Sequence, residues 1–240
     1  MNKIWKSNKS INMSILEHLT ELRERFLLII LIFSLITIIC LLNINHIAYI
    51  IQEPAKGVKF LQLAPGEYFF VSIKMSVFLG FILSSPFSIY QTILFIIPGL
   101  TLQETQKIIP LLISSIILFF IGLLFAFKLL VPAALAFFIN YGSSIVEPIW
   151  SFEEYFNFIL LLLFSTGLTF QIPIIQIIIG ILNIYSSVNM LSFWRYIIFI
   201  STIIGAIITP STDPITQIFM TLTILILYFS GIIVLKILKK

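Results

Sequence analysis

Long stretches without a charged residue dominate this sequence and decide what it can fold into. Hydrophobic residues make up 60% of the 240 residues and charged residues only 10%, against about 25% charged residues in soluble domains. A helix needs about 20 apolar residues to cross a bilayer. We therefore expect an all-α, polytopic membrane protein, a single membrane domain over residues 1–240, with six transmembrane helices near 26–42, 71–97, 109–130, 155–182, 193–208 and 215–235.

The segments between these stretches are short. Residues 43–68 form the longest linker, where we expect an ordered loop with a short helix at Ile47–Gln52. The third transmembrane helix is expected to end near Lys128 and Pro132, because proline interrupts helices. A second loop is expected over Tyr141–Glu154.

The fifth apolar stretch, residues 193–208, is short once Arg195 is placed at the membrane interface. A re-entrant segment and a short span with local thinning of the bilayer both fit its length. We favour the short span. The two alternatives leave the sidedness of the chain ends unchanged.

Positive charge is distributed unevenly over the two sides of a six-span arrangement. Cytoplasmic segments carry the excess of Lys and Arg, so we expect both termini in the cytoplasm or the stroma. The first apolar run lacks a small-residue cleavage site and is expected to remain as a helix. Ten basic residues share the side of the termini: Lys3, Lys6, Lys9, Arg23, Arg25, Lys107, Arg195, Lys236, Lys239 and Lys240. The opposite side has Lys56, Lys59 and Lys128, with Lys74 near it.

A short amphipathic helix, Ser14–Arg25, is expected just before the first span, after a polar N-terminal tail. Ser14 and Glu17 have the spacing of a capping box. Glu17, Glu21 and Glu24 gather on one face, and Arg25 lies one turn beyond Glu21, where an ion pair can form. Helices at membrane surfaces usually display Lys and Arg, so acidic residues here indicate a site for a basic ligand. A solvated face with internal ion pairs has equal weight.

The sequence contains no constellation of residues typical of an enzyme, and we expect no enzymatic activity, no metal site and no cofactor. His18 and His46 stand apart from each other, and Cys40 is the one cysteine. There is no phosphate-binding glycine loop, and the net charge of +4 is too dispersed to indicate nucleic acid. Transporters of protons and cations usually keep ionisable groups deep in the membrane, and here no Asp or Glu lies deep in an expected span.

The deepest polar feature is Gln171, with Pro173 and Gln176 after it, and these three residues are expected to interrupt the fourth span. A side-chain amide in hydrocarbon needs a hydrogen-bond partner. An internal bond to a neighbouring helix is favoured over a bond to another protein's helix. A run of aromatic residues at the start of this span is interpreted as an interface belt: Phe152, Tyr155, Phe156 and Phe158.

Five sequence motifs resemble the twin-arginine (Sec-independent) protein translocase subunit TatC family, in the same order and on a six-span layout. They are EHLTELRERFL before the first span, FIIPGLTLQE after the second, FFIGLLFAF in the third, FQIPI in the fourth and TPSTDPITQ between the last two. The last motif looks like cyanobacterial and plastid members. The resemblance implies a glove-shaped bundle in a plastid thylakoid or bacterial inner membrane.

By this resemblance, the protein receives folded cargo through a signal peptide with two adjacent arginines, and the proton-motive force drives export. Glu21 and Glu104 would bind the arginines, with Arg23 in the same motif, while Gln171 and Thr209 would contact partner helices. Many members carry Glu at the position of Gln171, so a protonation switch at residue 171 is excluded here. Members also often carry Glu-Arg-Arg where this chain has Glu104-Thr105-Gln106. Further motif positions are Pro54, Pro98, Pro173, Pro210, Asp213 and Gln217.

The implied partners are twin-arginine signal peptides, single-span subunits of the TatA/TatB type and the lipid bilayer. The chain is expected to form a homo-oligomer within a hetero-complex. A small-solute secondary transporter or channel is the alternative, and it requires polar groups along a continuous path. A structural subunit of a redox complex is a third candidate, although the sequence offers no pair of haem-ligating histidines.

Overall fold

The computed structural model describes residues 15–238, except 56, 97–101, 143–146, 182–183 and 210–212; the side chains of 15, 93, 96, 102–108 and 142 are also left out. Ser14, Pro98, Pro210 and the side chain of Glu104 therefore lie outside the described residues. The chain divides into two compact units: unit 1 is Met1–Ile44 with Ile73–Ile116, and unit 2 is Asn45–Ser72 with Ile117–Lys240.

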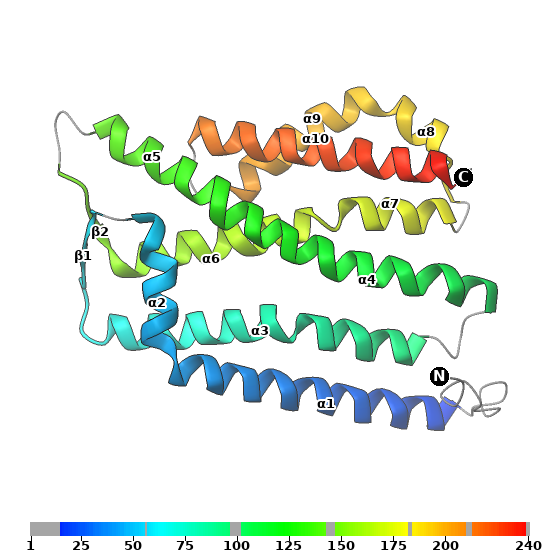
Figure 1. Cartoon of the computed structure of the whole chain (residues 1–240), viewed down its shortest axis with the longest axis horizontal. Helices are drawn as coiled ribbons and strands as arrows, with labels where there is room; N and C mark the ends of the chain where they lie inside the picture. The colour runs from blue at the N-terminus through cyan, green and yellow to red at the C-terminus, as the bar shows by residue number, and fades with distance from the viewer. Residues whose placement is uncertain are drawn as a thin grey trace. The chain divides into compact units, whose positions relative to one another are not determined.

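Unit 1 consists of α1 (Ile15–Leu42), most of α3 (Glu67–Ile96) and the first part of α4 (Leu102–Phe125). The start of α1, the end of α3 and the start of α4 lie at one end of this unit (Figure 1). Gly80 of α3 lets the two long helices approach closely, because a Cβ there would lie only 3.1 Å from the Cα of Thr37. As predicted, the acidic helix continues into the first apolar run without a break.

Unit 2 contains the other elements. They are α2 (Ile44–Gln52), a 3₁₀ turn (Glu53–Ala55), β1 (Lys59–Leu61), the end of α4, a π-helical turn (Ala126–Leu130), α5 (Val131–Gly142), β2 (Ile149–Ser151), α6 (Phe152–Thr169), α7 (Ile172–Ile181), α8 (Ser187–Ser192), α9 (Trp194–Ile208) and α10 (Pro214–Ile237). α10 packs along α7 and α9 (Figure 1). Fully buried apolar side chains from α6 and α10, such as Phe156, Leu162 and Met220, form the core of this unit.

The linker regions of unit 2 are joined by a two-stranded parallel sheet that the sequence analysis did not predict. Lys59 pairs with Ile149, Phe60 with Trp150 and Leu61 with Ser151. Nearby, the hydroxyl of Tyr155 donates a hydrogen bond of 2.8 Å to the carbonyl of Ile51. The loops between the apolar helices are therefore connected to one another by specific bonds.

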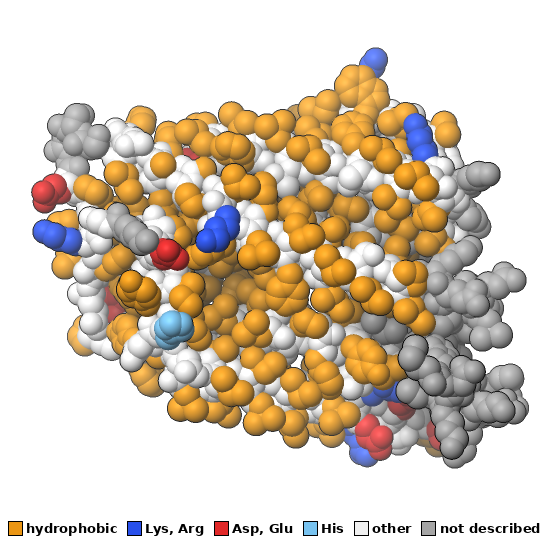
Figure 2. All heavy atoms as spheres, in the orientation of Figure 1, with side chains coloured by type: hydrophobic (Ala, Val, Ile, Leu, Met, Phe, Trp, Pro, Cys, Tyr) orange, Lys and Arg blue, Asp and Glu red, His pale blue; other side chains and the backbone are white. Residues whose placement is uncertain are grey.

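Among the described residues, five helical stretches are long and apolar enough to cross a membrane: Leu16–Leu42, Glu67–Thr92, Ile109–Tyr141, Phe152–Ile181 and Pro214–Ile237. The shorter apolar helix α9 has 15 residues, which gives a length of about 22 Å against a hydrocarbon core of about 30 Å. Hydrophobic side chains cover most of the face seen in Figure 2. Large apolar residues are exposed on every long helix, far beyond the patches that soluble proteins expose.

Two predicted boundaries are wrong. The third helical stretch does not end at Lys128 and Pro132, because the π-helical turn and α5 continue it to Gly142. The short helix in the first linker begins at Ile44 rather than Ile47. The predicted interruption of the fourth span is present, since α6 ends at Thr169 and α7 begins at Ile172.

The interpretation of the aromatic run as an interface belt is also wrong for two of its residues. Tyr155 and Phe156 are buried inside unit 2. The ring of Tyr155 contacts that of Phe60 at a centroid distance of 4.8 Å. These rings therefore stabilise the junction of β1 with α6 rather than contacting lipid.

Candidate functional site

The acidic face of α1 contains an ion pair that the sequence predicts. Arg25 donates from Nε to Oε1 of Glu21 at 3.0 Å, and its Nη2 contacts the same oxygen. Its Nη1 donates to Oε1 of Gln91 on α3 at 3.1 Å. Oε2 of Glu21 is buried and has no hydrogen-bond partner among the described residues. One oxygen of this carboxylate therefore remains able to accept a hydrogen bond.

The surroundings of this pair are mostly apolar. A small cavity of about 120 Å³ is lined by Leu22, Arg25, Phe26, Ile29, Gln91, Thr92 and Phe95. The ring of His18 stacks on that of Phe95 with centroids 4.2 Å apart. Charge interactions are stronger in such surroundings than in bulk water, which favours the ion pair of Glu21 with Arg25.

The other residues predicted for this site are placed only in part. Arg23 and Glu24 are exposed on α1 beside Glu21. Glu104 lies in the first turn of α4, in the same unit as Glu21, with its side chain outside the described residues. Gln91 was not predicted, because nothing in its local sequence indicates that it meets Arg25.

Gln171, the predicted contact for a partner helix, lies in the turn between α6 and α7 and is partly buried. Its backbone N–H donates to the carbonyl of Leu168 at 2.9 Å, and its carbonyl accepts from the N–H of Ile175 at 3.1 Å. Pro173 follows in the first turn of α7, where a helix needs no N–H donor. Gln171 therefore lies at the break between two consecutive helices.

Gln176 is the more deeply buried amide, with 6% of its surface exposed. Neither its oxygen nor its nitrogen has a hydrogen-bond partner among the described residues. Gly231 of α10 provides the space, because a Cβ at that position would lie 3.0 Å from the Cδ of Gln176 and 3.2 Å from the Cα of Pro173. α7 and α10 therefore approach closely at this amide.

The last motif has a clear local role. Asp213 caps α10, where Oδ2 accepts from the N–H of Thr216 at 2.9 Å and Oδ1 from its hydroxyl at 2.6 Å. Thr209 is buried at the end of α9 and donates to the carbonyl of Gly205 at 2.9 Å. Gln217 is partly buried on the first turns of α10, and Pro54 lies in the 3₁₀ turn after α2.

Glu67 is a buried carboxylate whose role the sequence analysis missed. Its Oε2 accepts from the N–H groups of Leu63 and Ala64 at 2.6 and 3.0 Å. Its Oε1 accepts from the N–H of Glu153 at 2.9 Å and from the hydroxyl of Ser151 at 3.4 Å. Gly66, with φ of +79°, forms the turn that precedes it. One side chain thus contacts both linkers. Its position in the first turn of a helix, where acidic residues are common, is the sequence signal that could have drawn attention to it.

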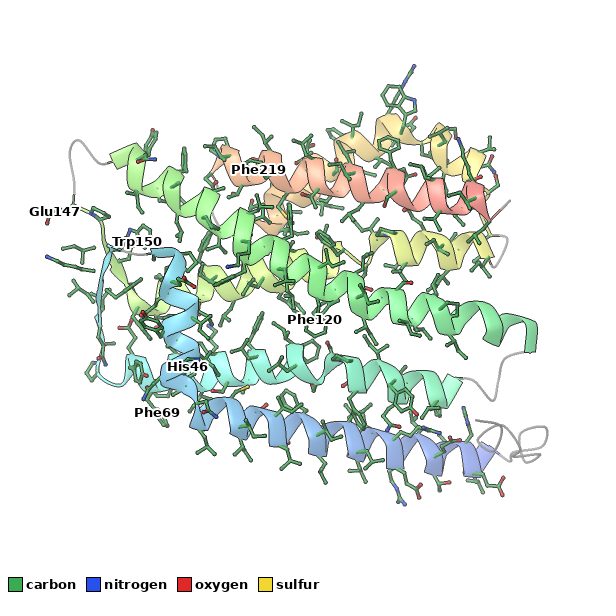
Figure 3. The ribbon with its side chains drawn as sticks, in the orientation of Figure 1. His46, Phe69, Phe120, Glu147, Trp150 and Phe219 are labelled. Atoms are coloured by element: carbon green, nitrogen blue, oxygen red, sulfur yellow. The ribbon has the colours of Figure 1, made fainter. Side chains whose placement is uncertain are left out.

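A larger cavity of about 660 Å³ lies within unit 2 between α5, β2 and α6. Its lining includes Phe138, Trp150, Glu154 and Phe158. Figure 3 shows Trp150 on β2, and Glu147 just before it. Its lining belongs to unit 2 and does not include Glu21, so this cavity and the predicted cation site are separate features.

Long apolar helices joined by short linkers that hydrogen-bond to one another define a multi-pass integral membrane protein. The chain belongs to the TatC family, because the family model described as "Sec-independent protein translocase protein (TatC)" matches residues 17–222. It is a family of translocase components and not of enzymes. Cyanobacterial and chloroplast members fit a thylakoid or bacterial inner membrane.

Individual relatives agree with this assignment. The chain is 64% identical over 237 residues to an uncharacterized tatC-like protein, ycf43, of Gracilaria tenuistipitata var. liui, covering 97% of this chain and 100% of that one. It is 47% identical over 230 residues to the Sec-independent protein translocase protein TatC of Synechocystis sp., covering 96% and 91%. A crystal structure of the twin-arginine translocase receptor TatC superposes with a TM-score of 0.77 at 33% identity, covering 93% of this chain and 100% of that one.

Proposed function

We propose that this chain is the signal-peptide receptor and core subunit of a twin-arginine translocase, which exports folded proteins using the proton-motive force. The observation that carries the proposal is the buried Oε2 of Glu21, which has no hydrogen-bond partner among the described residues and belongs to a carboxylate next to the apolar cavity lined by Leu22 and Arg25. A guanidinium group fits a carboxylate through two parallel hydrogen bonds. Glu21, in the second turn of α1, and Glu104, in the first turn of α4, belong to one unit and would each bind one arginine, together with Arg23.

The apolar part of the signal must supply much of the affinity. An exposed ion pair contributes only about 0–1 kcal/mol, so two such pairs give a weak complex. Leu19, Leu22 and Phe26 of α1 expose 54%, 43% and 57% of their surface, and they offer an apolar surface next to the carboxylate. The acidic residues would therefore select for the arginines of the signal, and hydrophobic contact would supply most of the affinity.

Photocrosslinking tests the placement of the signal. A photoreactive side chain at Leu22 should crosslink to the segment of a signal peptide that contains its two arginines, because Leu22 is exposed beside Glu21. A matched probe at Tyr141, which is 82% exposed at the end of α5, should give no product with that segment. Equal crosslinking from both positions would contradict the proposed site.

We propose that both termini lie in the cytoplasm or stroma, because ten basic residues share that side against three on the other. Tags at either end should be accessible to a membrane-impermeant reagent only from the cytoplasmic or stromal side. A tag within Tyr141–Glu147 should be accessible only from the opposite side. Opposite sidedness of the two termini would refute the six-span arrangement.

We propose that Gln171 pairs with a polar side chain on the transmembrane helix of a single-span TatA/TatB-type subunit, together with Thr209. Replacing Gln171 by Leu should weaken partner association by about 1–2 kcal/mol, the range of a hydrogen bond in a membrane, without loss of signal binding. Gln171→Glu should be tolerated, since a protonated carboxyl forms similar bonds. Pull-down of the partner, alongside signal crosslinking, measures both effects. Unchanged pull-down with Gln171→Leu would mean that the amide serves only this chain's own fold.

A further inference from the structure

The guanidinium of Arg25 already occupies the carboxylate that the proposed receptor offers to its ligand. Two of its nitrogens contact a single oxygen of Glu21, and the third donates to Gln91 across the gap between α1 and α3. A guanidinium paired with a free carboxylate usually binds both oxygens in parallel. Here the bond to Gln91, a side chain that is nine-tenths buried, fixes the group so that it contacts Oε1 alone.

This arrangement leaves Oε2 of Glu21 buried and unpaired within the described part of the chain. Buried acceptors in proteins are nearly always satisfied, so the free oxygen indicates a site that is completed by another donor. The side chains of Glu21 and Arg25 are only 20% and 22% exposed. A donor that reaches Oε2 must therefore displace Arg25 or share the carboxylate with it at close range.

An ion pair between residues four apart on a helix can be purely local. Two observations distinguish this pair from that case. Arg25 has a third hydrogen bond, to a residue on another helix. In addition, the bonds from Arg25 leave Oε2 of Glu21 without a hydrogen-bond partner among the described residues. A local pair requires neither feature.

We propose that Arg25 is a specificity-determining residue, a resident guanidinium with which every incoming cation must compete for Glu21. This inference rests on the proposed function. An arginine of the signal replaces the hydrogen bonds of Arg25 with an equivalent fork of N–H donors. A lysine offers a compact, strongly hydrated ammonium without that planar fork, so it cannot compensate for the bonds it breaks. Arg25 thus excludes Lys-Lys signals more strongly than Arg-Arg signals.

The test compares two labelled synthetic peptides, one with Arg-Arg and one with Lys-Lys before the same apolar segment, bound to the full-length protein in nanodiscs. Arg25→Lys keeps the charge and removes the fork. We expect the preference for Arg-Arg over Lys-Lys to fall about tenfold, the scale of losing one charge-assisted hydrogen bond, mainly through tighter binding of Lys-Lys. Arg25→Gln should reduce the preference at least as much. Arg195→Gln, which removes a charge stacked on Trp194, is the control and should preserve it.

Three results would overturn the inference. The first is an unchanged preference for Arg-Arg in Arg25→Lys, and the second is loss of binding to both peptides in these variants. The third is an equal gain in affinity for both peptides in Arg25→Gln, because removing any positive charge near the site would have that effect. Glu21→Gln separates this inference from the proposed function. If Glu21→Gln binds the Arg-Arg peptide fully, the receptor site itself is misplaced. If it loses binding while Arg25→Lys keeps the wild-type preference, only the role of Arg25 fails. Size-exclusion profiles confirm that each variant is folded.

Discussion

Replacing Glu21 or Glu104 by Ala or Lys should abolish export of cargo with a twin-arginine signal while the protein remains in the membrane. Each substitution removes a carboxylate that would accept the fork of a guanidinium, and Lys adds repulsion of the arginines. Export of a folded reporter, together with the amount of protein in the membrane fraction, measures the effect. The loss should be at least tenfold, because two weak pairs act together with one hydrophobic segment.

Glu24→Gln is the matched control, since Glu24 is an exposed acidic residue on the same helix. It should retain export close to the wild-type level. If the double variant Glu21→Lys, Glu104→Lys bound the signal peptide fully, the assignment of these two residues would be wrong.

The second large effect is structural and concerns Glu67. Glu67→Ala removes the acceptor for three backbone N–H groups and the hydroxyl of Ser151. Buried donors left without partners are unfavourable, and here donors in both linkers lose their shared acceptor at once. Thermal unfolding in detergent should show a midpoint lower by about 5–10 °C, and limited proteolysis should cut residues 59–64 faster.

Glu153→Ala provides the comparison for this experiment. It removes a neighbouring exposed carboxylate but keeps the backbone N–H that donates to Glu67. Glu67→Gln should be intermediate, because it retains one acceptor oxygen. Identical unfolding of Glu67→Ala and Glu153→Ala would show that the carboxylate does not hold the linkers together.

Local sequence patterns predicted the features that depend on neighbours in the chain. The apolar runs predicted the spanning helices, and the spacing of Glu21 and Arg25 predicted their ion pair. The break before Pro173 followed from the missing N–H of proline. In each case the interacting groups lie within about one helical turn, where periodicity and spacing carry the information.

Features that depend on distant residues could not be predicted in this way. Gln91 meets Arg25 from 66 positions away, and Tyr155 bonds to Ile51 from 104 positions away. The parallel pairing of β1 with β2 joins two three-residue strands that are too short to show alternation.

Pro132 misled the boundary prediction for a physical reason. It follows a π-helical turn in which the N–H of Val131 donates to the carbonyl of Ala126. Local π adjustments of this kind let a membrane helix continue through a proline. The helical stretch therefore extends to Gly142.

The hydrogen bonds of the Glu67 carboxylate can form only in a fixed order while the chain is synthesised. Its bonds to Leu63 and Ala64 can form as soon as that turn leaves the ribosome, whereas Ser151 and Glu153 emerge only after α4 and α5. At about 5–20 residues per second, translation separates the two events by several seconds. During that interval β1 is an unpaired edge, open to wrong partners. The nascent chain must therefore insert its early helices without this connection, and β1 can pair with β2 only when the fourth span begins to leave the ribosome.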